Sequence, residues 1–328
     1  MPEMTYRDAL NLALKEELRR DPSVVVWGED VALYEGSFKV TRGLLAEFGE
    51  ARIKDTPISE NTIIGVAIGA AMGGLRPVVE LMTVNFALLA MDQLINHMTK
   101  IRYMFGGQTF LPMVVRMPGG GGSQLAAQHS QSLESFFMHA PGMRVVVPAT
   151  PADAKGLLKS AIRDDNPVVF LEHELLYNSK GEVPEDPEFL LPFGQADIKR
   201  EGSDVTIVAY SRMTILSLMA ADELAKEGIS CEVVDLRTLN PLDTATFVAS
   251  VKKSGRAVVV EECWQSAGLG GDIAWRIHDA CFDNLLAPVK RVSGLDVPMP
   301  YSRKLEKLCI PQVETIIEAV KATIKAQY

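Results

Sequence analysis

The sequence predicts an α/β fold with two domains. Short apolar runs alternate along the chain with stretches of helical periodicity, which is typical of a sheet whose strands are buried on both faces. The chain has 328 residues, about twice the length of a typical domain. From 176 to 199 the alternation stops in a segment rich in Pro, Gly and acidic residues, which we interpret as a linker. We therefore expect domains at 1–175 and 200–328.

The elements of the first domain follow from its apolar runs. Thr5 is expected to cap a helix that ends at Asp21 and Pro22, and the strand VVVW follows directly. The segment PADAKGLLKSAIRD predicts a later helix. Further buried strands are predicted at RPVVELM, LPMVVRMP, MRVVVP and NPVVFLE. This alternation indicates a parallel sheet with helical connections.

The second domain repeats the alternation on a smaller scale. Its predicted strands are DVTIVAY, CEVVDL, RAVVVEE and APVKRV. Helices are expected near 212–227, 243–253 and 272–282, and a closing helix after Pro311. We expect a smaller α/β domain.

Composition excludes several classes of protein. Hydrophobic residues make up 47% and charged residues 23%, and no apolar run approaches the roughly 18 residues of a membrane span. The net charge of -9 and the scattered Lys and Arg argue against nucleic-acid or membrane partners. The four cysteines have no C-x-x-C spacing, so we expect reduced core thiols. The N-terminus does not resemble a targeting peptide, which favours an intracellular compartment.

Two features near residue 60 each allow two readings. Glu60 directly precedes an apolar, Gly-rich run, where a carboxylate either stabilises a helix N-terminus or serves a chemical role. Gly65, Gly69 and Gly73 recur at intervals of four, so they would line one side of that helix and allow another backbone to approach. The approaching backbone belongs either to a partner subunit or to the same domain.

A second candidate site is the segment MPGGGGSQLAAQHSQS, residues 117–132. Its four consecutive glycines and His129 could direct backbone N–H groups and an imidazole at one ligand, or they could form a mobile loop. The segment GLGGD at 268–272 departs from G-x-G-x-x-G, because Ile273 occupies the last position. The chain also lacks G-x-x-x-x-G-K-[ST], G-x-S-x-G and H-E-x-x-H.

Several motifs together carry a family resemblance. TPISE, ELMTVNF, AAQHSQ, KSAIRDDNPVVFLE, NPLD and VSGLDVPMPY occur in the order typical of one group. The chain resembles the beta subunits of the thiamine-diphosphate-dependent first component of 2-oxo acid dehydrogenase complexes, most closely the pyruvate dehydrogenase (acetyl-transferring) type. The resemblance extends from TYRDALN to IPQVE. It implies a transketolase-like pyrimidine-binding domain and a transketolase C-terminal-like domain.

The resemblance assigns roles to four residues. Glu60 matches the glutamate that hydrogen-bonds a ring nitrogen of the cofactor's aminopyrimidine and relays a proton. Phe86 matches the aromatic residue that packs on that ring, with Met82 as an apolar wall beside it. His129 matches the active-site histidine, which is expected to handle protons in acyl transfer or in attack on the substrate carbonyl.

The resemblance also implies a potassium site that braces a loop. Its ligands would be backbone carbonyls and one carboxylate, which suit a hard cation. An ordinary helix C-terminus that contains an Asp is the alternative reading. The matching positions are Met113, Ala161, Ile162, Asp164 and Asn166.

The implied activity is oxidative decarboxylation of pyruvate with reductive acetylation of a lipoyl group. We find no GDG followed by Asn some 25 to 30 residues later, the family pattern that holds the cofactor's diphosphate and Mg²⁺. An alpha subunit would supply that part in an alpha2beta2 heterotetramer, and a dihydrolipoyl acetyltransferase core would be a second partner. The resemblance favours bacterial cytoplasm or plastid stroma.

Several rival functions stay open. Branched-chain 2-oxo acid and acetoin dehydrogenase beta subunits share most of these motifs. A fragment of a transketolase or deoxyxylulose-phosphate synthase fits less well, because the chain begins at its own helix cap and ends in a whole domain. A non-catalytic assembly subunit would keep the spaced glycines but would need neither Glu60 nor His129.

Overall fold

The computed structural model describes residues 1–326 and divides the chain into two compact units. The first unit comprises Met1–Gly119 and Phe136–Phe193. The second comprises Gly120–Ser135 and the chain from Gly194 onward. The segment Gly120–Ser135, which lies inside the predicted domain 1–175, therefore groups with the second unit.

The first unit contains eight strands among its described residues, together with most of the short helices. The strands are β1 (Glu3–Thr5), β2 (Val24–Gly28), β3 (Ile53–Asp55), β4 (Arg76–Glu80), β5 (Val114–Gly119), β6 (Arg144–Val146), β7 (Val168–His173) and β8 (Lys180–Glu182). The helices are α1 (Tyr6–Arg20), α2 (Leu44–Phe48), α3 (Glu60–Met72), η1 (Val84–Ala90), η2 (Asp92–Met98), α4 (Ile101–Met104), α6 (Pro151–Arg163) and η3 (Glu174–Leu176). A further helix, α5 (Glu134–His139), begins in the second unit and ends in the first.

A parallel sheet forms the centre of the first unit. Its strands lie in the order β6-β7-β5-β4-β2-β3, and every neighbouring pair is parallel. All residues of β2, β5 and β7 are buried, which explains why these strands read as continuous apolar runs in the sequence. The predicted parallel sheet is confirmed.

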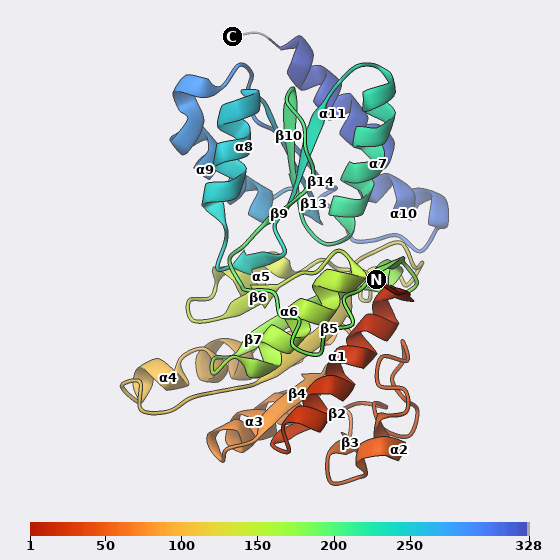
Figure 1. Ribbon diagram of the computed structural model, residues 1–328, viewed down its shortest axis with the longest axis vertical. Helices are drawn as coiled ribbons and strands as arrows, with labels where there is room; N and C mark the ends of the chain where they lie inside the picture. Colours follow the sequence, from red (N-terminus) through yellow and green to blue (C-terminus); the bar gives the residue numbers. More distant parts are fainter. Residues whose placement is uncertain (327–328) are drawn as a thin grey trace. The chain divides into compact units, whose positions relative to one another are not determined.

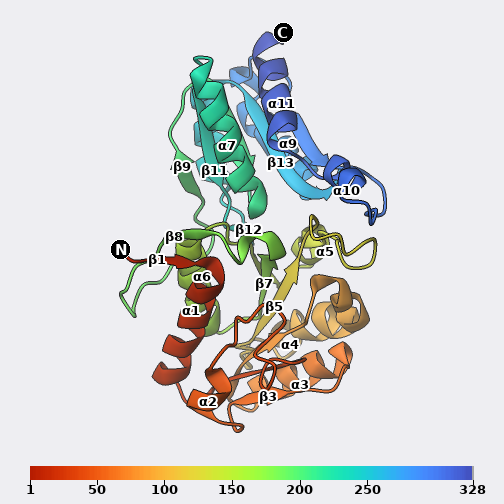
Figure 2. The same ribbon diagram turned by 90° about the vertical axis from the view of Figure 1, so that its right-hand side faces the viewer.

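Helix α1 begins and ends where the sequence predicts. The Thr5 hydroxyl accepts a hydrogen bond from the Asp8 N–H at 3.1 Å, which caps the first turn. The helix ends at Arg20, before Asp21 and Pro22. Its apolar face packs against α6, and the two helices run side by side in Figures 1 and 2.

The second unit has its own elements. The strands are β9 (Asp197–Arg200), β10 (Val205–Ala209), β11 (Cys231–Asp235), β12 (Thr238–Asn240), β13 (Ala257–Trp264) and β14 (Lys290–Gly294). The helices are α7 (Arg212–Lys226), α8 (Thr244–Ser254), α9 (Leu269–Cys281), η4 (Phe282–Asn284), α10 (Arg303–Cys309) and α11 (Val313–Lys325). Helix α9 thus begins three residues before its predicted start, 272, because Gly268 serves as its N-cap.

The second unit is a sheet between two helical layers. Its strands lie in the order β14-β13-β10-β11-β9, and only β9 runs antiparallel to its neighbour. Helices α7 and α11 cover one face, and α8 and α9 cover the other (Figure 1). Buried side chains from the strands, α7 and α11, including Val205, Val233 and Ile316, form one core.

The predicted linker, 176–199, contains ordered pairing. Strand β8 pairs antiparallel with β1, and the start of β9 pairs with β11. These strands are short and lie at edges, with most of their side chains exposed or half-buried. Such strands lack the apolar run by which the buried strands are recognised in the sequence.

The expectations about cysteine and membrane helices can be compared with the structure. Cys231, Cys263, Cys281 and Cys309 are all free and buried, as expected. Burial raises the pKa of Cys231 to about 11 and that of Cys263 to about 12, so neither is a reactive thiolate. Within residues 1–326, none of the helices has the length and apolar character needed to cross a membrane.

Candidate active site

Acidic side chains collect at the carboxyl ends of three neighbouring strands in the first unit. Glu29 directly follows β2, and Glu80 is the last residue of β4. Glu60 begins α3, the helix that follows β3. Ligands of open α/β sheets bind at the carboxyl ends of the strands, so this edge is the candidate site.

Close packing of β2 against β4 brings the acids together. A Cβ on Gly28 would lie 2.4 Å from the Glu80 carbonyl oxygen, so only glycine allows the two backbones to approach in this way. Glu29 follows directly, and its side chain is 4% exposed. The strand ends therefore hold carboxyl groups out of water.

Glu60 and Glu29 form a buried pair of acids. Glu60 is 4% exposed although it lies in the first turn of a helix, where most acidic residues stay in water. Burial and the negative charges of Glu60 and Asp30 together raise the pKa of Glu29. Its Oε1 has no hydrogen-bond partner in the part of the chain that the structure describes. A buried, unpaired carboxyl oxygen is suited to bind a ligand group.

Met82 and Phe86 lie at the same edge. Met82 comes two residues after the end of β4, and Phe86 lies on η1, where its N–H donates to the Thr83 carbonyl at 3.1 Å. Both side chains are half-buried. Helix η1 packs against α3, the helix that begins with Glu60. These three predicted residues thus belong to one unit and to adjoining elements.

A second set of charges, behind this edge, was not found by sequence reasoning. The guanidinium of Arg116 on β5 is fully buried; Nη1 donates to Glu80 at 2.6 Å and Nε to Glu172 at 2.7 Å. The Tyr177 hydroxyl donates to Glu172 at 2.7 Å. Burial raises the pKa of Glu80, although Arg116 opposes the shift. The available signal was an acid near the end of each of two buried strands, Glu80 in RPVVE and Glu172 in NPVVFLE.

His129 belongs to the second unit and is exposed. Its loop contains the four glycines, but three of the loop's N–H groups do not point at a ligand. The Gly121 N–H donates to Glu262 at 2.6 Å. The N–H groups of Gly122 and Gln124 donate to Glu306 at 2.9 and 3.1 Å. The idea that these N–H groups converge on a ligand with the imidazole is therefore wrong for these three.

The residues matched to a potassium site lie around the end of α6. The Asp164 Oδ1 accepts from the Asn166 backbone and side-chain amides at 2.7 and 2.8 Å. The Met113 carbonyl accepts from the Val168 N–H at 2.9 Å, which joins the start of β5 to β7. Oxygens of several of the predicted residues thus meet in one region.

A positively charged side chain, that of Arg76, already contacts this region. Arg76 Nη1 donates to the carbonyls of Ile162 and Asp164 at 3.0 and 3.1 Å. The Ala161 carbonyl accepts weakly from the Asp164 N–H at 3.4 Å. Oxygen ligands of this kind suit a monovalent cation, but Arg144 also lies 3.3 Å from the Asp164 carboxylate and Arg102 donates to the Asn166 side chain, so guanidinium groups already contact several of these oxygens. Among the described residues there is no cluster of three or more His, Cys, Asp or Glu able to hold a metal ion.

The spaced glycines open one face of α3. A Cβ on Gly69 would meet no heavy atom of the described residues within 4 Å, and one on Gly65 would meet only the Gln93 side chain, at 3.5 Å. Gly73 is the C-cap and not a helical residue. Val66, on the same helix, is 57% exposed. Close backbone packing inside this chain therefore does not account for Gly69.

Two family models match most of the chain. Residues 2–180 match the transketolase pyrimidine binding domain, and residues 194–316 match the transketolase C-terminal domain. A solved split-gene transketolase, described as an inactive beta4 tetramer, superposes with a TM-score of 0.80 at 25% identity. The superposition covers 99% of this chain and 100% of the transketolase chain.

Curated relatives match over nearly the whole length. The pyruvate dehydrogenase E1 component subunit beta of Rhizobium meliloti is 51% identical, covering 98% of this chain and 70% of the relative. That of Rickettsia felis is 52% identical, with 97% and 98% covered. The mitochondrial subunit beta-2 of Oryza sativa is 50% identical, with 97% and 86% covered.

Proposed function

Because this chain belongs to the family of pyruvate dehydrogenase E1 beta subunits, we propose that it completes, with an alpha subunit, the enzyme that oxidatively decarboxylates pyruvate and acetylates a lipoyl group. The observation that carries the proposal is the buried Glu29–Glu60 pair at the carboxyl edge of the first sheet. A structural role for two neighbouring buried acids would need basic partners, whereas Glu29 Oε1 has no partner among the described residues.

The residues at this edge fit the pyrimidine end of thiamine diphosphate. An aminopyrimidine offers a flat apolar ring and ring nitrogens, which suit the half-buried Phe86 and Met82 and the carboxyl of Glu60. When bound, the cofactor supplies the electron sink that lets a 2-oxo acid lose carbon dioxide.

The chain's own residues then have distinct tasks. Glu60 would place its carboxyl group against a ring nitrogen and would move a proton between the two. Phe86 and Met82 orient the ring and exclude water from it. His129 exchanges a proton at its imidazole during acyl transfer to the lipoyl group, or during attack on the substrate carbonyl.

The proposal includes partners that the missing diphosphate module requires. An alpha subunit supplies the groups for the diphosphate and Mg²⁺ in an alpha2beta2 heterotetramer, and Gly69 of α3 belongs to a subunit contact. A dihydrolipoyl acetyltransferase core accepts the acetyl group. Bacterial cytoplasm or plastid stroma is the proposed compartment, although relatives at about 50% identity also include proteins named mitochondrial.

We extend the proposal to a structural potassium ion held by Met113, Ala161, Ile162, Asp164 and Asn166. The carbonyl oxygens around the end of α6 support it, and Arg76 weakens it by placing a positive charge on two of them. Bound potassium would raise the thermal unfolding midpoint relative to choline at equal ionic strength. Equal midpoints in the two salts would exclude the site.

A reconstitution experiment tests the main proposal. The chain is mixed with a candidate alpha subunit, thiamine diphosphate and Mg²⁺, and dye reduction is followed with pyruvate, branched-chain 2-oxo acids and acetoin. We expect pyruvate to be preferred and either chain alone to be inactive. Activity of this chain alone would refute the shared site. Preference for another substrate would move the enzyme to the branched-chain or acetoin class.

Variants of the site sharpen the test. Glu60→Gln keeps the size but loses the proton exchange, so we expect turnover to fall at least about 10²-fold. Glu50→Gln, an exposed acid of the same unit, is the matched control and should retain full turnover. Near-normal turnover of the Glu60 variant would contradict its role. His129→Ala should slow reductive acetylation of the lipoyl group.

A further inference from the structure

The His129 loop is closed at its base by the second unit's own hydrogen bonds. The Gly120 N–H donates to the Gln131 carbonyl at 3.3 Å, so the intervening segment leaves and returns at one place, as in an Ω-loop. The Ser132 hydroxyl, just beyond that base, donates to Glu262 Oε1 at 3.2 Å.

Glu262 anchors this base to β13. Its Oε1 accepts from both Gly121 and Ser132, and Oε2 lies 3.3 Å from Arg212 Nη1. A Cβ on Gly121 would lie 2.7 Å from Ile310 Cδ1, so the backbone sits directly on the core of this unit. The carboxylate is buried and charge-compensated, which makes it a strong acceptor.

Glu306 binds the loop at Gly122 and Gln124, closer to His129. The residue, on α10, is 2% exposed, although among the described residues it forms no ion pair. Its Oε1 accepts from the N–H groups of Gly122 and Gln124, and Oε2 lies 3.1 Å from the Gln124 N–H. Backbone donors thus replace the water that a buried carboxylate would otherwise need.

The loop adopts an uncommon backbone conformation at and after Gln124, the last residue that Glu306 binds. Gln124 and Ala126 have φ of 59° and 65°, in the left-handed region that side chains other than glycine rarely enter. The Ala126 carbonyl then accepts from the His129 N–H at 3.3 Å, which closes the turn that carries the imidazole. Such backbone persists only where surrounding contacts hold it.

We propose that Glu306 and Glu262 are positioning residues for His129. Their carboxylates bind the backbone N–H groups on the approach to the histidine and so determine where its imidazole lies. The inference rests on the proposed function, because it takes His129 to act in acetyl transfer. The two carboxylates are accordingly the receptor for the glycine-rich loop of their own chain.

A double-mutant cycle in the reconstituted heterotetramer tests the proposal. Glu306→Gln removes the negative charge and puts an NH2 group, which cannot accept a hydrogen bond, in place of the Oε2 that faces the Gln124 N–H. We therefore expect kcat for lipoyl acetylation to fall about 10-fold. The KM for pyruvate should change less than about twofold, because the buried edge of the first unit is untouched. In the His129→Ala background the same substitution should cost less than about twofold.

Controls separate positioning from folding. Glu318→Gln removes one exposed charge from α11 and should leave kcat unchanged in both backgrounds. Ser132→Ala deletes one bond to Glu262 and is a milder variant should Glu306→Gln fail to assemble; its smaller loss should also vanish without His129. Thermal midpoints and size-exclusion profiles verify that each variant folds and assembles.

The outcomes distinguish two failures. An equal loss from Glu306→Gln with and without His129 would overturn the positioning role while the proposed function stands. Unchanged kcat in Glu306→Gln would overturn it as well. Normal lipoyl acetylation by His129→Ala itself would instead contradict the role of His129 in the proposed function, and the inference would fall with it.

Discussion

Glu134, the first residue of α5, is a half-buried residue whose carboxyl oxygen Oε2 is out of water, and it shows how one such acid can make stability depend on pH. Burial raises the pKa of its carboxyl to about 8, and the negative charges of Glu262 and Glu261 add to the shift. Its Oε2 and the Tyr210 hydroxyl both lack hydrogen-bond partners among the described residues. The group is therefore favoured in its neutral form when the chain is folded.

The sign of the effect follows from linkage. A raised folded pKa gives stability that is full below the usual value of 4.5 and is lost as pH rises toward 8. Glu134→Gln cannot ionise, so its stability relative to the parent should increase across that window, by about 1.4 kcal/mol per pH unit. Urea unfolding at pH 5 and pH 8 measures this, with Glu318→Gln as control. A pH-independent difference would contradict it.

At the residue scale, the residues alone left Glu60 and the His129 loop with two readings each, and only the family resemblance assigned them roles. Glu60 and His129 occur within recognisable motifs, TPISE and AAQHSQ. Glu306 and Glu262 act on a loop 184 and 141 residues away, and no local pattern connects an acid to a backbone N–H at that distance. Glu29 is adjacent to its strand, but its importance depends on Glu60 lying beside it in the fold.

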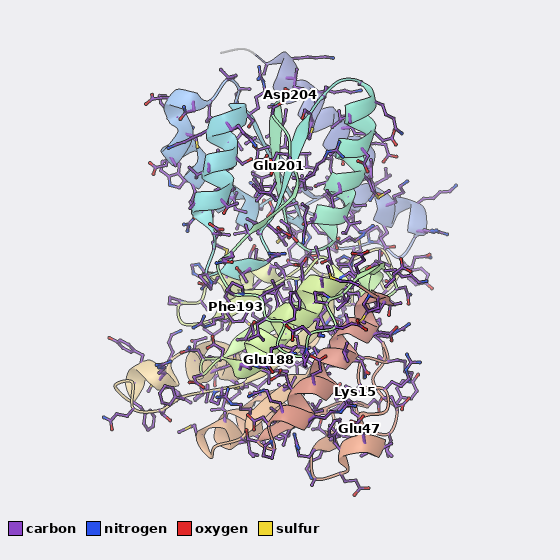
Figure 3. All side chains as sticks on the ribbon, in the orientation of Figure 1. Lys15, Glu47, Glu188, Phe193, Glu201 and Asp204 are labelled. Atoms are coloured by element: carbon purple, nitrogen blue, oxygen red, sulfur yellow. The ribbon has the colours of Figure 1, made fainter. Side chains whose placement is uncertain are left out.

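At the scale of elements, α1 and α6 are joined by buried ion pairs. Glu17 on α1 is fully buried, and Arg163 Nη2 on α6 donates to it at 2.8 Å. Hydrogen bonds to Glu17, and then to Glu188, raise the pKa of Arg163. Lys159, also fully buried, lies 3.8 Å from Glu17. Glu188, labelled in Figure 3, is the exposed partner of Arg163, at 2.6 Å.

Removing the buried acid should be costly. Glu17→Ala deletes the buried carboxylate and leaves the Nε and Nη2 donors of Arg163 without that acceptor, so we expect a loss of about 3–5 kcal/mol in the free energy of unfolding. Glu188→Ala is the matched control, because it removes the exposed acid of the same arginine and should change stability little. Urea denaturation compares the two; equal effects would show that burial does not decide the cost.

The same scale explains which elements could be predicted. Buried strands such as β2, β5, β7, β10 and β13 have continuous apolar runs, and their positions are confirmed. Strands β8 and β9 were not predicted, because an edge strand is held by backbone pairing that leaves little trace in side-chain polarity. The start of α9 at Leu269 followed a Gly cap and not the usual Ser, Thr or Asp.

At the scale of the whole molecule, the open face of α3 leads to a prediction about assembly. Gly69→Ala meets no atom of the described chain, so it should stabilise the free subunit by about 0.5–1 kcal/mol through helix propensity. If an alpha subunit packs closely on this face, the added methyl should weaken association about tenfold through overpacking.

Opposite signs in two measurements identify such a contact. Thermal unfolding of the free chain reports the first effect, and analytical ultracentrifugation of the mixture with the alpha subunit reports the second. Glu318→Ala on α11, an exposed helical change in the other unit, should leave association unaltered. Unchanged association of Gly69→Ala would place the subunit contact elsewhere.

The grouping of Gly120–Ser135 with the second unit limits how this protein can be divided or recombined. A fragment that ended at Phe193 would retain His129 but lose both of the carboxylates that receive its loop. A chimaera that exchanged only the chain beyond Gly194 with a relative would join one parent's loop to another parent's receptor. The segment to exchange is therefore discontinuous in the sequence, because the loop and the second unit must be taken from the same parent.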